Sequence, residues 1–344
     1  MFERILVPLD GSERAEQAIP VAARIAKATG GSIVLLQVVE QVTAYDMYSV
    51  RSSFVSPQEV EAAITKATDY LKSTIQKDEL EGVGIQVEVL AGAVAPTICA
   101  YAQSTRADMI VMCSHGYTGF KRWFLGSVAD VVSRSASVPV LILREGEFLP
   151  TDILQNGSPL HTLVMVDGSP LSEAVIEPAA HLVSALAAPA QGTLHFLRIV
   201  NFPVTYGQGK SQVNYSIEFV SQEKQAAKTY LTSLMEQLKK GSAAHLNLAM
   251  TASVIASSDV AHTIIEASEN PEERYALLAL STHGRSGLKR LVIGSVTQRV
   301  LHNTKLPILI VPPQQNAAKK ESNQTPVGTG EKAPGDGPGR VGIL

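Results

Sequence analysis

Two patterns of hydrophobic and polar positions alternate along the chain. Short, nearly continuous apolar runs such as Arg4–Leu9 predict strands that are covered on both faces. Apolar residues at every third or fourth position predict helices, the first of which spans Ala15 to Ala26, with Ser12 as its N-cap and Gly30 near its end. Repeated strand–helix units predict a parallel sheet with right-handed crossovers and helices on both faces.

The same pattern predicts the remaining elements. In the first half the further strands are Ile33–Val39, Ile85–Leu90, Met109–Cys113 and Val138–Leu143, and the further helices are Pro57–Leu80, Ala95–Ser104 and Gly126–Ser135. In the second half the strands lie near Thr162–Val166, Thr193–Ile199, Leu246–Val254, Tyr275–Leu280 and Pro307–Val311.

The chain contains an internal repeat of domain size. The segment ILVPLDGS at Ile5–Ser12 returns as TLVMVDGS at Thr162–Ser169, and Ser114–Arg122 returns as Thr282–Arg290. We therefore expect an α/β protein of two doubly wound, five-stranded parallel-sheet domains related by an internal pseudo-twofold repeat. The expected domains are 1–145 and 160–313, joined by a linker at 146–159.

Segments at the margins of the repeat carry their own expectations. Val138–Leu143 and Leu306–Val311 are apolar terminal strands that would otherwise be exposed edges, so we expect them to pair within the chain. Residues 314–344 contain many Gly and Pro and no aromatic residue, which predicts a disordered tail. The polar segments Glu40–Ser56 and Asn201–Asn214 are expected to be mobile loops.

Composition narrows the class of protein. Among 344 residues there are only two cysteines, which excludes a disulfide scaffold and a four-cysteine zinc site. The net charge of −3 provides no basic field for nucleic acid. No apolar run approaches the roughly twenty residues of a membrane span, and the N-terminus does not resemble a signal peptide. A cytoplasmic protein without nucleic-acid or membrane partners is expected.

The position of a ligand site follows from the predicted sheet. In open α/β sheets ligands bind at the carboxyl ends of the strands, where the strand order reverses. This rule selects the ends of strands one, two and four in each copy, which are Asp10, Val38 and Cys113–Gly116, and Asp167, Ile199 and Ser281–Gly284. A helix then opens at Gly126 or Gly294, and the free N–H groups of a helix N-terminus suit a phosphate. The alternative is that these glycines only shape turns.

With these residues the chain resembles two universal stress protein domains in tandem. The family's nucleotide motif is Gly, two residues, Gly, nine residues, then Gly-Ser or Gly-Thr. Gly116 with Gly126-Ser127 fits this motif in the first copy, and Gly284 with Gly294-Ser295 fits it in the second. The leading Gly is replaced by Cys113 and by Ser281. The resemblance implies an adenine-nucleotide alpha-hydrolase-like, Rossmann-like fold.

The resemblance also implies a set of binding residues, with Asp10 and Asp167 at the adenine and Val38 and Ile199 bracketing it. In the first copy the set is Pro8, Leu9, Asp10, Val38, Met112, Cys113, His115, Gly116, Gly126, Ser127 and Val128. In the second copy it is Met165, Val166, Asp167, Ile199, Leu280, Ser281, His283, Gly284, Arg285, Gly294, Ser295 and Val296. The implied cofactor is ATP or another adenine nucleotide, with or without Mg²⁺. The two domains are expected to pair as an internal dimer, and a further homodimer stays open.

Several alternatives remain at this point. His115 and His283 either contact the nucleotide or order the turn. General acid–base catalysis is less favoured, because no second titrating group repeats beside each histidine. Asp10 and Asp167 could instead cap or pair locally. The leading hypothesis is a stress-response regulator that binds adenine nucleotide, with at most slow ATP hydrolysis and no catalytic residue assigned. The alternative, which Cys113 and Ser281 favour, is a regulatory module that has lost nucleotide and acts through protein partners.

Overall fold

The computed structural model describes residues 1–40, 57–114, 125–144, 149, 155–202, 210–283 and 293–313. Side chains at 57 and 210–216 are left aside. The expected tail at 314–344, nearly all of the expected loop Glu40–Ser56 and part of the linker at 146–159 lie outside the described residues.

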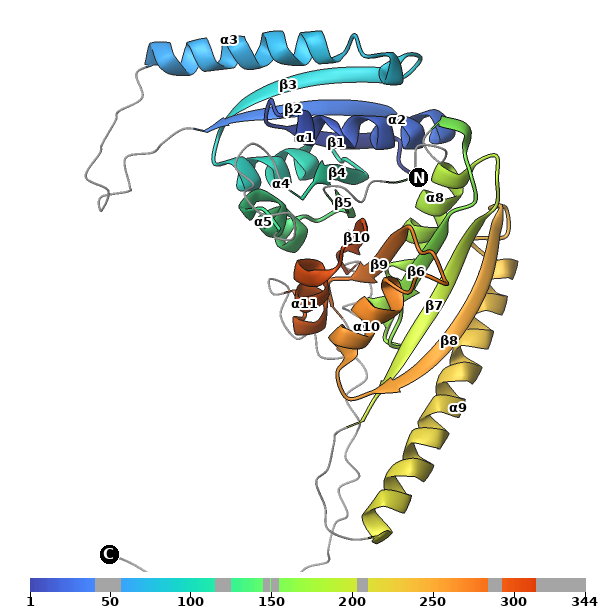
Figure 1. Ribbon diagram of the computed structural model, residues 1–344. Coiled ribbons are helices and arrows are strands. Elements are labelled where there is room, and N and C mark those ends of the chain that lie inside the picture. Colours follow the sequence, from blue (N-terminus) through green and yellow to red (C-terminus); the bar gives the residue numbers. More distant parts are fainter. Residues whose placement is uncertain are drawn as a thin grey trace, which may run out of the picture.

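The two halves of the chain fold into matching series of elements (Figure 1). The first half contains β1 (Arg4–Leu9), α1 (Glu13–Glu16), α2 (Ala18–Thr29), β2 (Ser32–Glu40), α3 (Pro57–Thr74), the 3₁₀ turn η1 (Asp78–Leu80), β3 (Gly84–Gly92), α4 (Val94–Ser104), β4 (Met109–Cys113), α5 (Ser127–Ser135) and β5 (Val140–Leu143). The second half contains β6 (His161–Met165), α7 (Pro170–Glu173), α8 (Ile176–Ala187), β7 (Gly192–Asn201), α9 (Lys210–Lys240), β8 (Leu248–Ser257), α10 (Val260–Ser268), β9 (Leu277–Ser281), α11 (Ser295–Asn303) and β10 (Ile308–Val311).

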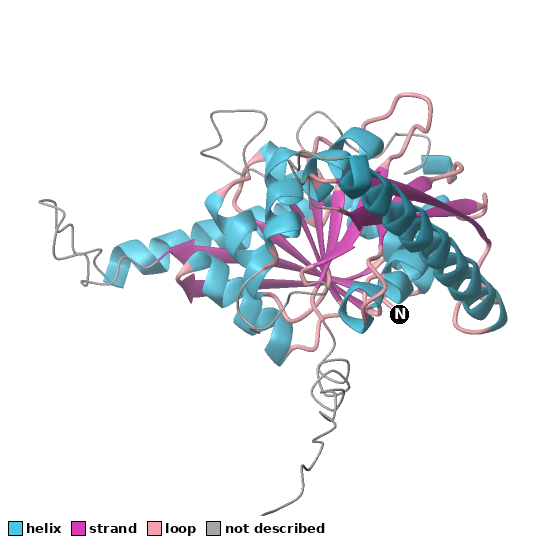
Figure 2. Cartoon of the chain, turned by 90° about the horizontal axis from the view of Figure 1, so that it is seen from below, coloured by secondary structure: helices cyan, strands magenta, loops and turns pink. Residues whose placement is uncertain are grey.

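All ten of these strands form one sheet with the order β3-β2-β1-β4-β5-β10-β9-β6-β7-β8. Within each half the pairings are parallel, and the helices lie on both sides of the strands (Figure 2). The halves meet at an antiparallel pairing of β5 with β10, in which Leu309 lies opposite Leu141. The expected pairing of the two terminal strands is confirmed, and the strand order is palindromic about it.

The helix after the first strand differs from its prediction. It is divided into α1 and α2 at Gln17, although Ser12 caps α1 through the Ala15 N–H and Gly30 ends α2 in a left-handed conformation, as expected. Pro20 has no N–H to donate to the Glu16 carbonyl, so the helical ladder is interrupted at that point.

Two other element bounds also differ from their predictions. The helix predicted over Pro57–Leu80 ends at Thr74, and η1 follows it. The loop predicted over Asn201–Asn214 is wrong at both ends, because Asn201 ends β7 and α9 begins at Lys210. Residues 210–214 are polar but contain neither Gly nor Pro, so polarity alone was a poor indicator of a loop.

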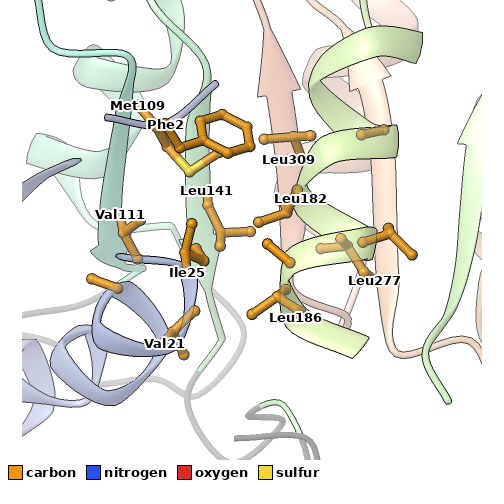
Figure 3. Packing of buried hydrophobic residues seen from close by; sticks show 14 of the residues in the cluster. Phe2, Val21, Ile25, Met109, Val111, Leu141, Leu182, Leu186, Leu277 and Leu309 are labelled. Atoms are coloured by element: carbon orange, nitrogen blue, oxygen red, sulfur yellow. The ribbon is translucent and has the colours of Figure 1, made fainter. Parts of the chain in front are cut away.

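The hydrophobic core has one layer on each face of the sheet, and both layers continue across the junction of the halves. Leu141 and Leu309 belong to one layer, and their strand neighbours Ile142 and Ile308 belong to the other. Figure 3 shows Leu141 beside Leu182 of α8. The halves therefore share one continuous core.

Polar contacts also join the halves. Arg24 of α2 donates hydrogen bonds to the carbonyls of Ala188 and Leu186, and Arg144 donates one to the carbonyl of Leu301. These carbonyls lie at the C-terminal ends of α8 and α11, where a cation is favoured by the helix dipole. Burial lowers the pKa of Arg144 to about 10.

Among the described residues, no helix has the length and apolar character needed to cross a bilayer.

Candidate functional site

A pocket of about 510 Å³ opens at the carboxyl edge of the sheet in the second half. Every site residue predicted for this half that the structure describes contributes to its lining: Met165, Val166, Asp167, Ile199, Leu280, Ser281, His283, Gly294, Ser295 and Val296. They come from β6, β7, β9 and the start of α11, which are far apart in sequence. Gly284 and Arg285 lie outside the described residues.

The acid after the first strand of each half is held by its own turn. Asp167 Oδ1 accepts a hydrogen bond of 2.8 Å from the Ser169 N–H, and Asp10 Oδ1 accepts one of 3.0 Å from the Ser12 N–H. Gly168 lies between the two bonded residues with φ of +85°, a conformation that suits glycine. The local pairing that was the alternative for Asp10 and Asp167 is therefore present. In both halves this hydrogen bond goes to Oδ1 of the carboxylate.

The start of α11 is placed by a close backbone contact. The Gly294 N–H donates to the Thr282 carbonyl at 2.8 Å, and a Cβ added to Gly294 would lie 3.3 Å from that same oxygen. Ser295 and Val296 follow as the first residues of α11 and line the pocket. The free N–H groups and partial positive charge of this helix N-terminus are available to an anion in the pocket.

The two residues at the leading position of the glycine motif end β4 and β9. Ser281 lines the pocket. Cys113 directs its Sγ toward the Ala15 carbonyl of α1, at 3.9 Å, and packs against the core layer on that side. His283 is 8% exposed, and its Nδ1 lies 2.9 Å from Thr282 Oγ1.

The first half repeats this arrangement in its backbone. Gly126 precedes α5, and its N–H donates to the Ser114 carbonyl at 2.7 Å. The predicted residues of this half that the structure describes lie at the ends of β1, β2 and β4 and the start of α5: Pro8, Leu9, Asp10, Val38, Met112, Cys113, Gly126, Ser127 and Val128. His115 and Gly116 lie outside the described residues.

Sequence reasoning missed nine lining residues of the pocket, which are Ser172, Arg198, Val200, Asn201, Phe219, Glu223, Val260, Ile264 and Thr297. Arg198 is 9% exposed, and its guanidinium carbon lies 5.0 Å from the ring centroid of Tyr230. The available signal for Arg198 was a charged residue within the apolar run Phe196–Val200. Nothing in the sequence indicated that α9 reaches this pocket, because that contact depends on tertiary packing.

Comparisons with known proteins agree on one family. The model described as the universal stress protein family matches residues 1–144 and 160–312. Universal stress protein MJ0531 of Methanocaldococcus jannaschii is 31% identical over 150 residues, covering 42% of this chain and 84% of that protein. Universal stress protein MJ0577 of the same organism is 30% identical over 155 residues, and the match covers 42% of this chain and 96% of that protein.

Among solved structures, a universal stress protein from Archaeoglobus fulgidus DSM 4304 matches nearly the whole chain. The TM-score is 0.57, and the match covers 91% of this chain and 97% of the other. Sequence identity is 18%, so this likeness is one of fold.

Proposed function

The chain belongs to the universal stress protein family, and on this premise we propose that it binds ATP or another adenine nucleotide in the cytoplasm and acts as a stress-response regulator. The observation that carries the proposal is the convergence of the motif residues of β6, β7, β9 and α11 on one pocket. The lining of this pocket includes the acid Asp167 and the helix N-terminus at Ser295, which we take as its two ends.

The proposed pose follows from these two ends. Asp167 accepts a hydrogen bond from the base, and the backbone of Ile199 lies beside it at the end of β7. The phosphates lie against the first N–H groups of α11, where Ser295 adds a hydroxyl donor. Mg²⁺, where it takes part, enters with the phosphates, and we assign it no protein ligand.

Slow turnover or none is part of the proposal. His283 lines the pocket, and the sequence repeats no second titrating group beside it and its counterpart His115. A general base for hydrolysis needs a group that orients it and a place for water. We therefore propose that the nucleotide acts as a bound signal.

Native mass spectrometry of the purified full chain tests the proposal. The expected result is at least one adenine nucleotide per chain, and titration calorimetry with ATP should give saturable binding. Absence of binding at millimolar ATP would contradict the proposal. It would favour the interaction module, which the replacement of the leading Gly by Cys113 and Ser281 also favours.

A further inference from the structure

At one position of the repeat the two halves carry side chains of different charge, close to the acid that we assign to the base. Gln37 of β2 corresponds to Arg198 of β7, one residue before the paired positions Val38 and Ile199. Both side chains lie against the turn that follows the first strand of their half. A Cβ added to Gly11 would lie 3.9 Å from Gln37 Nε2, and one added to Gly168 would lie 3.0 Å from Arg198 Nη1.

The two side chains differ in their hydrogen-bonding groups, because Gln37 carries an acceptor as well as donors. Gln37 Oε1 is buried and has no hydrogen-bond partner among the residues that the structure describes. A buried acceptor without a partner costs free energy. Arg198 at the equivalent position has only donors, because a guanidinium carries five N–H groups and no acceptor.

The Arg198 guanidinium is held in place by its neighbours. Its carbon lies 5.0 Å from the centroid of the Tyr230 ring, and the Tyr230 hydroxyl donates to Glu173 Oε1 at 2.7 Å. With only 9% of its surface exposed, Arg198 has little freedom to turn away from the pocket that it lines.

The wall beside Arg198 is also specific to the second half. Phe219 and Glu223 of α9 line the pocket. Tyr70 and Tyr230 make equivalent hydrogen bonds to Glu16 and Glu173, which aligns α3 with α9. In that alignment the first half has Glu59 in place of Phe219 and Ala63 in place of Glu223. An aromatic ring and a carboxylate are thus added to the second pocket.

We propose that the second site prefers a 6-oxopurine nucleotide, with guanine or hypoxanthine as its base, whereas the first site, with Gln37, retains adenine. This inference rests on the proposed nucleotide binding and refines it for the second half. Adenine carries an amino donor at position 6 and guanine a carbonyl acceptor, so the donors of Arg198 suit guanine and oppose adenine. Glu223 supplies an acceptor for the N1–H and amino group of guanine. Asp10 and Asp167 are common to both sites and do not discriminate.

The test uses the full chain with Gly126→Asp, so that the second site is measured alone. Titration calorimetry is carried out with GTP, ITP and ATP. We expect GTP and ITP to bind at least tenfold more tightly than ATP, and Arg198→Gln to reverse that order. Arg134→Gln, which removes a partly exposed arginine from the last turn of α5, is the matched control and should leave the ratio unchanged.

Two further variants measure separately how Glu223 and the position shared by Gln37 and Arg198 contribute to the base preference. Glu223→Ala should weaken both GTP and ITP and make their affinities equal, because Glu223 accepts from the N1–H of both bases but from the amino group of guanine alone. In a Gly294→Asp chain, Gln37→Arg should move the preference of the first site from ATP toward GTP. This reciprocal change keeps the test decisive if Arg198→Gln lowers the melting temperature.

The outcomes distinguish the two proposals. If the Gly126→Asp chain binds ATP as tightly as GTP, or if Arg198→Gln leaves the ratio unchanged in a folded chain, the base preference is overturned while nucleotide binding stands. If the wild-type chain binds none of the three nucleotides, the proposed function itself fails, and this inference fails with it.

Discussion

At the scale of single residues, the site depends on where a side chain is absent. Gly126 and Gly294 occupy the N-cap positions of α5 and α11, with extended backbone that other residues can adopt. Gly294 also lies close to the Thr282 carbonyl, where an added Cβ would be 3.3 Å away. A substitution here acts on the ligand volume and on the charge at the helix start more than on the fold.

Gly126→Asp combined with Gly294→Asp is expected to abolish nucleotide binding while the fold is retained. A carboxylate at the helix start occupies the phosphate position and repels it, although Asp is a favoured N-cap residue. Calorimetry measures binding, and circular dichroism checks the fold. Unchanged ATP affinity in a folded double mutant would refute the motif-based site.

The leading position of the motif allows a comparison between the halves. Ser281 lines the pocket, whereas Cys113 Sγ faces the Ala15 carbonyl. We expect Ser281→Gly to tighten nucleotide binding by removing a side chain near the ligand, and Cys113→Gly to leave affinity unchanged. Each Gly should lower stability by up to about 1 kcal/mol.

Calorimetry on the two single variants measures these affinities. Weaker binding by Ser281→Gly would instead show that the hydroxyl contacts the ligand. If Cys113→Gly were the variant that changed affinity, the placement of Cys113 toward α1 would be wrong.

At the scale of elements, one hydrogen bond recurs between the long helix of each half and the short helix after the first strand. Tyr70 of α3 donates to Glu16 at 2.8 Å, and Tyr230 of α9 donates to Glu173 at 2.7 Å. Burial, followed by the bond to the glutamate, raises the pKa of both phenols above their usual value of 10. These bonds hold the long helices against the carboxyl edge of the sheet.

Stability should therefore fall at alkaline pH. A phenol whose pKa is raised by folding contributes stability that is complete below pH 10 and is lost as pH rises toward the folded-state value. Tyr70→Phe and Tyr230→Phe should each lower the free energy of unfolding at pH 8 by about 1 kcal/mol, because a partly exposed hydrogen bond is lost. Each variant should also lose less stability than the wild-type chain above pH 10. Urea unfolding at pH 8 and pH 11 measures the free energy of unfolding. If the variant with both Phe substitutions loses as much stability between these pH values as the wild-type chain, the two phenols are not its cause.

At the scale of the whole molecule, the pairing of β5 with β10 joins two repeats into one ten-stranded sheet. This pairing leaves neither terminal strand as an exposed edge. Arg24 and Arg144 of the first half donate to carbonyls of the second at the margins of the junction. The two candidate sites are thus carried by a single continuous body.

A double-mutant cycle tests the junction. Leu141 and Leu309 lie opposite each other and are fully buried. Leu141→Ala and Leu309→Ala should each lower the free energy of unfolding by about 2–5 kcal/mol. The double mutant should cost at least about 0.5 kcal/mol less than the sum, because the two side chains share one contact. Additive losses in urea unfolding would contradict direct packing.

The sequence by itself determined the repeat, nearly all strand positions, the pairing of the terminal strands and the identity of the motif residues. It could do so because buried parallel strands are short apolar runs, and because the same motif occurs twice at strand ends such as Asp10 and Asp167. These signals are local or are repeated in the chain.

Only the tertiary structure decided which side chains complete the second pocket. Arg198, Phe219 and Glu223 belong to no motif, and they meet only because α9 packs along β7 and reaches the carboxyl edge of the sheet. It also decided that Cys113 Sγ lies 3.9 Å from the Ala15 carbonyl of α1 and that Ser281 lines the pocket. The direction of a side chain depends on the backbone and neighbours of each half, which spacing along the sequence does not encode.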